Sequence, residues 1–395
     1  MKPTHVLACL AAFLFGLELS HVNIGSVLHV QDFPAPSLGL VGPFAPNEIL
    51  KDNVHILFKY KINGSETTNV EDGGQSLLLI DKYAEAWHAY SSEDDDSNYS
   101  LADKPFANLG AARPLGFMKD AHGNVIVCDT NQGLVSLEPD GRVVLLASRV
   151  SASSPIDPDS YIQFANNLDI SQSAEGTIFF TDSVQLPAAV EHAPGERPYF
   201  EPMSTVMDTL VTGSKTGRLL AFYPQNGTVH VLAKGFWFAN GVALSGDESF
   251  VAVAETAGFR IHRFWLKGPK AGTMDILIER LPGFVDNMVR AADGSFWVAL
   301  PAPRTMQAYL LKSKILRALL RYVSPIQLRA APWGAIMKVS PDGEVLRFLM
   351  DTKGSRVSSI TDVQEHKLAD GRTRLFMGSL LQPYVSCIDI QDDAR

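Results

Sequence analysis

The chain has 395 residues, of which 46% are hydrophobic and 19% are charged. This composition supplies enough apolar side chains for a large core and too little charge for a disordered chain. The formal net charge of −9 excludes the densely basic surface that phosphate backbones require, so we expect no nucleic-acid partner. A neutral or cationic small ligand suits this charge better.

The N-terminal segment is hydrophobic. An apolar run from Val6 to Leu17 follows Lys2; it is shorter than the ~20 residues of a typical membrane span and is typical of a signal peptide or a signal anchor. We therefore assign residues 1–22 to such a leader and residues 40–392 to one domain. Either leader sends the chain into the secretory pathway, to the endoplasmic reticulum, to the plasma membrane through a single-pass anchor, or out of the cell.

Covalent modification is predicted at asparagines and not at cysteines. Three sequons make Asn63, Asn98 and Asn226 candidate glycosylation acceptors. Only two cysteines follow the leader, so there is no disulfide framework. Cys128 and Cys387 lie in strand-like runs and are interpreted as small buried hydrophobic residues, with a bridge between them as the alternative.

From about residue 40 the chain repeats one theme: an apolar strand, a tight turn rich in Gly, Asn or Asp, a second strand and a polar connection. Such turns are the strongest local signals for β-hairpins. Six units predict an all-β, six-bladed β-propeller. The units begin near Asn47, Arg113, Asn167, Asn240, Asp286 and Ser359, and their first turns are Asn63-Gly64, Gly123-Asn124, Glu175-Gly176, Gly246-Asp247, Asp293-Gly294 and Asp370-Gly371.

A segment near 306–323 interrupts the repeat. Its apolar residues fall on one side of a helix and its basic residues largely on others, which predicts an inserted amphipathic helix. Basic amphipathic helices often lie on membrane surfaces, and the alternative is a helix that packs on the propeller. The apolar positions are Leu310, Leu311, Ile315, Leu319 and Leu320.

Side-chain oxygens recur at the start of four repeats. The innermost strand of each blade starts at the central channel, so equivalent positions of different blades converge on one axis. Two carboxylates and two amide carbonyls form the hard oxygen shell that suits calcium, whereas zinc prefers nitrogen and sulfur. We therefore predict a Ca²⁺ site at the mouth of the channel, formed by Glu48, Asn166, Asn240 and Asp286.

Seven short motifs stand out after the first repeat. They are Arg113-Pro114-Leu115-Gly116, Phe179-Phe180-Thr181-Asp182-Ser183, Gly217-Arg218-Leu219-Leu220, Phe238-Ala239-Asn240-Gly241, Val253-Ala254-Glu255-Thr256, Leu266-Lys267-Gly268-Pro269 and Pro282-Gly283-Phe284-Val285-Asp286-Asn287. Together they resemble the strictosidine synthase-like family, strongly over residues 110–390 and weakly over 40–110. The resemblance implies the propeller and a kinship with paraoxonases and gluconolactonases, which are calcium-dependent hydrolases. It also implies metal ligands at the same four residues, with Asn287 as an additional group.

The chain departs from these relatives at informative positions. The usual Gly-Pro-Glu around the first ligand is read as Pro46-Asn47-Glu48, and a common Asn-Asp pair is Asn166-Asn167, which removes a carboxylate. The paraoxonase catalytic histidine falls on Leu115. The acid-base glutamate of the plant synthases falls near Thr361, with Asp362 offset from it.

These observations favour a calcium-dependent hydrolase of small esters or lactones, similar to the arylesterases. Asp286 is predicted to orient or deprotonate the attacking water, with Asn287 beside it. Histidines that could serve as bases instead are His88, His122, His192 and His366.

Two other functions stay open. The first is a non-catalytic propeller, stabilised by calcium, that binds a ligand or a protein at the membrane. The second is the amine-aldehyde condensation of the plant synthases, which is disfavoured because it needs a carboxylate where this chain has Thr361.

Overall fold

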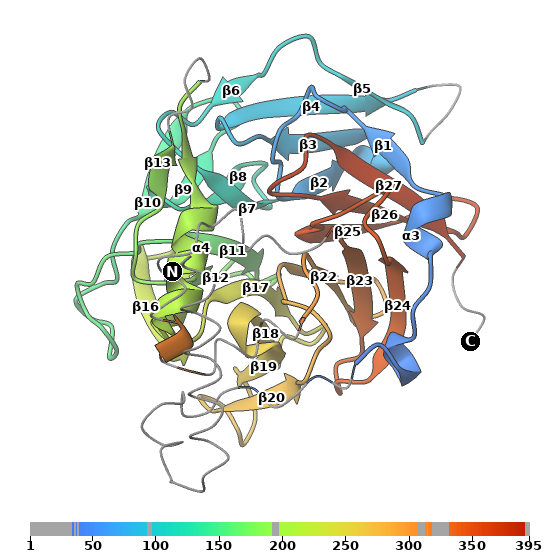
Figure 1. The fold of residues 1–395 in the computed structure, drawn as a ribbon. Helices are drawn as coiled ribbons and strands as arrows, with labels where there is room; N and C mark the ends of the chain where they lie inside the picture. Colours follow the sequence, from blue (N-terminus) through green and yellow to red (C-terminus); the bar gives the residue numbers. More distant parts are fainter. Residues whose placement is uncertain are drawn as a thin grey trace, which may run out of the picture.

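Six antiparallel sheets of four main strands each surround a central axis in the computed structural model, so the protein is a six-bladed β-propeller, as predicted (Figure 1). The structure describes residues 34, 37, 39–92, 97–191, 197–305, 308, 313, 315–317 and 332–391. The strands of each blade follow from the innermost outward. The first blade has β2 (Thr68–Glu71), β3 (Ser76–Ile80), β4 (Glu85–Ser91) and β5 (Tyr99–Leu101), and the second has β7 (Pro114–Lys119), β8 (Val125–Asp129), β9 (Gly133–Leu137) and β10 (Val143–Ala147). The third blade has β11 (Ala165–Ile170), β12 (Ile178–Asp182), β15 (Gly217–Tyr223) and β16 (Thr228–Phe236), and the fourth has β17 (Ala239–Leu244), β18 (Phe250–Glu255), β19 (Arg260–Trp265) and β20 (Met274–Ile278). The fifth blade has β21 (Met288–Arg290), β22 (Phe296–Leu300), β23 (Gly334–Val339) and β24 (Val345–Asp351), and the sixth has β25 (Asp362–Lys367), β26 (Thr373–Gly378), β27 (Val385–Ile390) and β1 (His55–Leu57).

Strand β1 closes the ring. It pairs antiparallel with β27, so the earliest strand of the propeller completes the last blade and covers an edge that would otherwise be open. The prediction that a unit begins near Asn47 and turns at Asn63-Gly64 is therefore wrong. The first blade begins at β2, and its first hairpin turns through the 3-10 helix η2 (Asp72–Gly74).

The other five predicted turns each join the first two strands of a blade. Gly294 and Gly371 have φ values of 84° and 87°, a left-handed conformation that glycine adopts without steric cost. Because both faces of each sheet are covered by neighbouring blades, the inner strands are buried throughout: β3, β8, β12, β18, β22 and β26.

The hydrophobic core is divided among the six contacts between neighbouring blades. Cys128 lies in the cluster between the second and third blades, and Cys387 lies in the cluster between the sixth and the first. Both are buried free thiols. This confirms their interpretation as small hydrophobic residues and excludes the alternative bridge.

An insertion between β12 and β15 lies over one face of the ring (Figure 1). It contains β13 (Ala189–Glu191), β14 (Tyr199–Glu201) and α4 (Pro202–Thr212). Helix α4 begins at Pro202 after the N-cap Glu201, whose carboxylate accepts from the Met203 N–H, and it ends at the left-handed Gly213. The remaining elements are η1 (Gly42–Phe44), α3 (Ile49–Asp52), β6 (Ala107–Asn108) and η3 (Thr256–Gly258).

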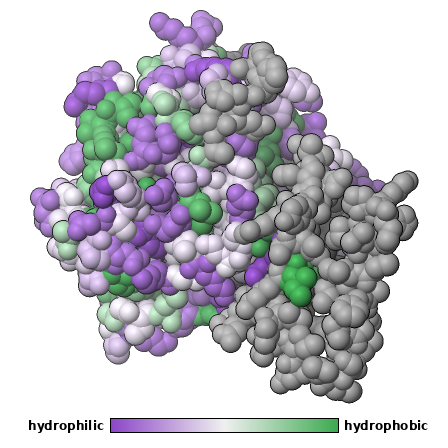
Figure 2. All heavy atoms as spheres, turned by 60° about the vertical axis from the view of Figure 1, so that its left-hand side comes forward, coloured by the Kyte–Doolittle hydropathy of each residue, from purple (hydrophilic) through white to green (hydrophobic). Residues whose placement is uncertain are grey.

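The predicted leader lies outside the described residues, as do most residues of the predicted helix near 306–323. Among the helices that the structure describes, none has the length and apolar character that a membrane span requires. The described surface in Figure 2 is largely polar, with hydrophobic side chains gathered in small groups.

Candidate metal centre

The innermost strands of three blades begin with a β-bulge. In β7, β11 and β17 the pairing register shifts by one residue directly after the first paired position. A bulge inserts an unpaired residue and re-aims its side chain. The bulges contain Leu115, Asn166 and Asn240.

The same position can be followed through all six blades. Each of the three bulge residues stands two positions before the residue that resumes the ladder, such as Val242 after Asn240. In the other blades, Glu66 stands two positions before Thr68 and Asp286 two before Met288. We call the resulting set the axial ring; all its members are buried, and they are Glu66, Leu115, Asn166, Asn240, Asp286 and Thr361.

The register in the sixth blade is fixed by a second set of equivalent contacts. Asn167 accepts from the Val242 N–H of the next blade at 3.2 Å, and Asp362 accepts in the same way from the Thr68 N–H at 3.4 Å. Asp362 therefore corresponds to Asn167, and the residue before it, Thr361, corresponds to Asn166.

Hydrogen bonds tie neighbouring ring members together. The Asn240 amide donates to Thr256 Oγ1 at 3.1 Å, and that hydroxyl donates to the Val285 carbonyl at 2.7 Å. Further round, the Asn287 N–H donates to the Thr361 carbonyl at 3.0 Å, and Thr361 Oγ1 donates to the Glu66 carbonyl at 3.3 Å. The contacts between neighbouring ring members thus use backbone groups, the Asn240 amide nitrogen and the Thr256 and Thr361 hydroxyls.

Four of those side-chain oxygens are buried without a hydrogen-bond partner. They are Glu66 Oε2, Asn166 Oδ1, Asn240 Oδ1 and Asp286 Oδ1, each from a different blade. Buried acceptors are almost always satisfied in native proteins, so these four oxygens make the ring the place where a cation could be held. Among the described residues no three His, Cys, Asp or Glu side chains are grouped to hold a metal; a cation here would be bound by two carboxylates together with amide oxygens.

The charges around the ring support a divalent cation. Burial raises the pKa of Asp286 to about 8 and that of Asp362 to about 7, and it raises the pKa of Glu66 well above its ordinary value. The negative charges of Asp286 and Asp362 raise the pKa of Glu66 further, and Arg113 lowers it. The raised pKa values favour neutral carboxyl groups as long as no cation is bound. When ionised, the three carboxylates and the Arg113 guanidinium would carry two net negative charges, which a divalent cation would neutralise.

Glu48, the predicted first ligand, lies elsewhere. It is the residue before α3, which packs beside β24, the outermost strand of the fifth blade, at the rim of the ring (Figure 1). Its Oε1 accepts from the Thr352 hydroxyl. The structure places Glu66 in the ring instead, because the first blade begins at β2 and not near Asn47. The motif Gly64-Ser65-Glu66 matches the usual Gly-Pro-Glu in two of three residues and could have indicated it.

The residues predicted for catalysis are divided between the ring and its surroundings. Asp286 belongs to the ring, and Asn287 is fully buried directly behind it, with a side chain that has no hydrogen-bond partner. No described histidine belongs to the ring. His88 stacks on Phe106 beside the outer strands of the first blade. His122 lies at a hairpin turn, and His366 of the sixth blade lies near Gly74 of the first. His192 lies outside the described residues.

Leu115 gives the ring one apolar member. It packs with Phe164, Val184 and Phe238, and the two phenylalanines, each two residues before a ring asparagine, meet edge to face at 5.5 Å between ring centroids. Phe238 has a φ of 68°, a strained conformation for an aromatic residue that is found mostly at functional sites. Leu115, which stands where paraoxonases have a histidine, is therefore part of an apolar cluster beside the ring.

Beyond the axial ring, in the direction in which the innermost strands run, side chains of these strands leave little space along the central axis. A void of about 20 Å³ remains between the innermost strands, which is room for about one water molecule. The insertion with α4 lies at the opposite face. The predicted glycosylation acceptors Asn98 and Asn226 are exposed, whereas Asn63 is half-buried and lines a pocket on this face.

Comparisons with known proteins agree with this architecture. Residues 197–269 match the strictosidine synthase family. Strictosidine synthase-like 10 from Arabidopsis thaliana is 35% identical over 309 residues, which cover 74% of this chain and 75% of that protein. The chain belongs to the strictosidine synthase-like family. Another relative in this strictosidine synthase-like group, the adipocyte plasma membrane-associated protein of Rattus norvegicus, is 31% identical over 71% of this chain and 70% of its own length.

Solved structures outside the family share its fold. A gluconolactonase from Xanthomonas campestris superposes with a TM-score of 0.55 at 14% identity, covering 90% of this chain and 97% of its own. The calcium-binding protein regucalcin from Agrobacterium tumefaciens has a TM-score of 0.51 at 11% identity, covering 86% and 95%. At these identities the likeness shows the propeller alone.

Proposed function

We propose that this strictosidine synthase-like protein is a calcium-dependent hydrolase of small esters or lactones. The observation that carries the proposal is the set of four buried oxygens without partners, contributed by four blades to one axis. The names of the fold neighbours, a gluconolactonase and a calcium-binding protein, are in line with it.

The residues present fit calcium. Glu66, Asn166, Asn240 and Asp286 would hold it through oxygens only, and the two carboxylates would neutralise its charge. A calcium ion bound there would polarise the substrate carbonyl as a Lewis acid and lower the pKa of a bound water molecule.

The side chains around the ring would then have different roles in the reaction. The Asp286 carboxylate orients the attacking water and takes its proton as the water oxygen bonds to the carbonyl carbon. The bond from that carbon to the leaving oxygen breaks, and the alcohol leaves with the proton. Asn287 positions Asp286 through its backbone bonds to Thr361 and Ala299. Leu115, with its apolar neighbours, keeps bulk water from one side of the ring.

A non-catalytic propeller, in which calcium only ties the blades together, is the second candidate. The observation that favours it is that no described histidine lies in the ring to act as a base. The condensation of the plant synthases gains no support, because Thr361 occupies the ring position and the Asp362 carboxylate bonds to the Thr68 N–H of the neighbouring blade.

We further propose that the chain works in the secretory pathway, on the basis of its apolar leader and of relatives named for the plasma membrane of adipocytes. The predicted helix near 306–323 would then provide contact with a membrane surface.

Hydrolysis of phenyl acetate, measured with calcium and with a chelator, tests the proposed activity. We expect hydrolysis that stops in chelator and returns when calcium is added in excess. Hydrolysis that continues unchanged in chelator would reject the mechanism, and the absence of hydrolysis together with calcium binding would favour the non-catalytic propeller.

A further inference from the structure

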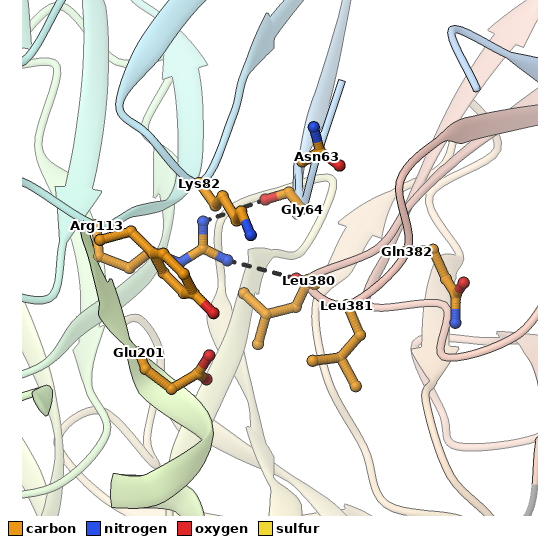
Figure 3. A pocket seen from close by; sticks show the side chains of 9 residues that line it. Asn63, Gly64, Lys82, Arg113, Glu201, Leu380, Leu381 and Gln382 are labelled. Atoms are coloured by element: carbon orange, nitrogen blue, oxygen red, sulfur yellow. Dashed lines mark hydrogen bonds between the residues drawn. The ribbon is translucent and has the colours of Figure 1, made fainter. Parts of the chain in front are cut away.

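A pocket of about 100 Å³ opens beside the axial ring. It lies between the first, second and sixth blades, and β14 of the insertion covers one side. Figure 3 shows its side chains: Arg113 and Lys82 lie near one another, and Glu201, Leu380 and Leu381 lie across the pocket from them.

Arg113 brings a buried cation to this pocket with much of its donor capacity unused. The side chain is 2% exposed. Its two terminal nitrogens donate to the carbonyls of Gly64 at 3.3 Å and Leu380 at 3.5 Å, both long, and its Nε has no acceptor. A guanidinium has five N–H donors, and a buried one without acceptors is costly, so a ligand that accepts hydrogen bonds would be favoured here.

Lys82 adds a second positive charge. Its ammonium lies 4.2 Å from the centroid of the Tyr199 ring, which leaves its hydrogen-bond donors available on the pocket side. The opposing carboxylate of Glu201 is engaged as the N-cap of α4, where it accepts from the Met203 N–H at 2.7 Å. The pocket lining therefore has two cationic side chains and one carboxylate, and the carboxylates of Glu66 and Asp81 also act on Arg113 from outside the lining.

The pocket adjoins the ring through three of its residues. Gly64 stands two positions before Glu66, and Arg113 stands two positions before Leu115. The Leu380 N–H donates to Thr361 Oγ1 at 3.1 Å. The pocket is thus separated from ring members of three blades by one layer of residues.

We propose that the pocket binds a carboxylate carried by the substrate in addition to its ester or lactone bond, with Arg113 and Lys82 as specificity-determining residues. This inference rests on the proposed hydrolytic function and names its substrate class. A carboxylate matches the planar donors of a guanidinium and gains from charge-assisted hydrogen bonds. Its place in the pocket would bring the neighbouring ester to the ring.

Two esters of similar leaving group test this preference. 4-Acetoxybenzoate carries a carboxylate, and 4-acetoxybenzamide is its neutral counterpart. We expect the full chain to prefer the anion in kcat/KM by about tenfold, and Lys82→Met to remove most of that preference. Lys104→Met, an exposed lysine on the same blade, should keep it. Equal kcat/KM values for the two esters, or an unchanged preference in Lys82→Met, would overturn the inference.

A binding measurement separates this inference from the proposed hydrolysis. 4-Hydroxybenzoate, which has no bond to cleave, should raise the melting temperature of the full chain, and 4-hydroxybenzamide should not. Lys82→Met and Arg113→Gln should each lose this response, and Lys104→Met should keep it. A response without esterase activity would retain the anion site and reject the hydrolase, whereas esterase activity without a response would do the reverse.

Discussion

Two glutamates near the beginning of the propeller differ in the surroundings of their carboxylates. Glu66 is buried on the axis, with an oxygen that has no partner and a pKa raised well above its usual range by burial and by neighbouring acids. Glu48 lies at the rim, where the Thr352 hydroxyl donates to one of its carboxylate oxygens; the other is also buried without a partner, so what separates the two glutamates is their place in the fold. Resemblance alone could not separate them, because the distinction depends on which strand forms the first blade.

Replacing each glutamate with glutamine tests this distinction. We expect Glu66→Gln to weaken calcium binding by about 10- to 100-fold, since it removes one of two charges that would neutralise the ion. The control Glu48→Gln should bind calcium like the wild type. Isothermal titration of both variants gives the comparison, and weaker binding in Glu48→Gln alone would restore the original prediction.

The three sequons also differ in their surroundings. Asn98 and Asn226 are exposed, whereas Asn63 is half-buried at the pocket beside Arg113, and the side chain of Ser65, two positions on, is fully buried. A carbohydrate at Asn63 would have to leave through a narrow space between blades. For protein made in animal cells, we therefore expect Asn98→Gln and Asn226→Gln each to reduce the mass by one glycan and Asn63→Gln to leave it unchanged. A loss of mass in Asn63→Gln would contradict this.

At the scale of the elements, the β-bulges at the start of the innermost strands explain which ring residues can be predicted from the sequence. Asn166 and Asn240 can be placed in the axial ring from the sequence, because each stands just before a legible strand, so that sequence spacing and structural equivalence agree. Asp286 precedes its strand at the same distance without needing a bulge. Where the register follows the sequence, propeller geometry is enough to bring the predicted ligands into one ring.

Other parts of the site depend on contacts that sequence spacing does not encode. Glu66 was missed because β1 joins the last blade, which moves the start of the first blade. The sequence indicates Asp362 only as the residue next to Thr361. Its position behind the ring becomes clear from the hydrogen bond that its carboxylate accepts from the Thr68 N–H. Arg113 stands out in the sequence only as part of a motif, because its burial beside a pocket depends on Gly64 and Leu380, which are far away in the chain.

The close approach of neighbouring innermost strands gives a prediction at this scale. A methyl group on Gly241 would lie 2.5 Å from the Asp286 carbonyl oxygen, whereas one on Gly246 would have 4.0 Å to its nearest neighbour. We expect Gly241→Ala to separate the fourth and fifth blades, to cost about 1–3 kcal/mol of stability and to weaken calcium binding. Gly246→Ala should change the stability by less than about 1 kcal/mol. Urea denaturation compares the two variants, and equal midpoints would show that the strands have room to adjust.

For the whole molecule, closure of the ring concentrates charge on the axis. Six blades converge there, so acids from the first, fifth and sixth blades meet in one buried volume with Arg113 as a partial counterion. A single blade would leave each of these carboxylates in water. We therefore expect the stability of the propeller to depend on a bound cation.

This coupling predicts a dependence on pH. The folded-state pKa values of Asp286, about 8, and Asp362, about 7, lie above their ordinary value of 3.8. The folded chain then binds these protons more tightly than the unfolded chain, so the free energy of unfolding falls as the pH rises from about 4 to about 8. Buried acids away from the ring, Asp129 and Asp169, have pKa values of about 6 and contribute to the same trend only below neutral pH.

Calcium should reverse the upper part of this trend, because the ring carboxylates must ionise to bind it and are then neutralised. In chelator we expect the melting temperature to decrease from about pH 6 to about pH 8, and excess calcium should raise it by about 5 °C or more at the upper end. Glu66→Gln should reduce the response to calcium, and Glu48→Gln should keep it. A calcium response that is equal at both ends of this range would show that the ion binds away from Asp286 and Asp362. Calcium stabilises the fold more strongly as the pH rises only if its binding displaces their protons.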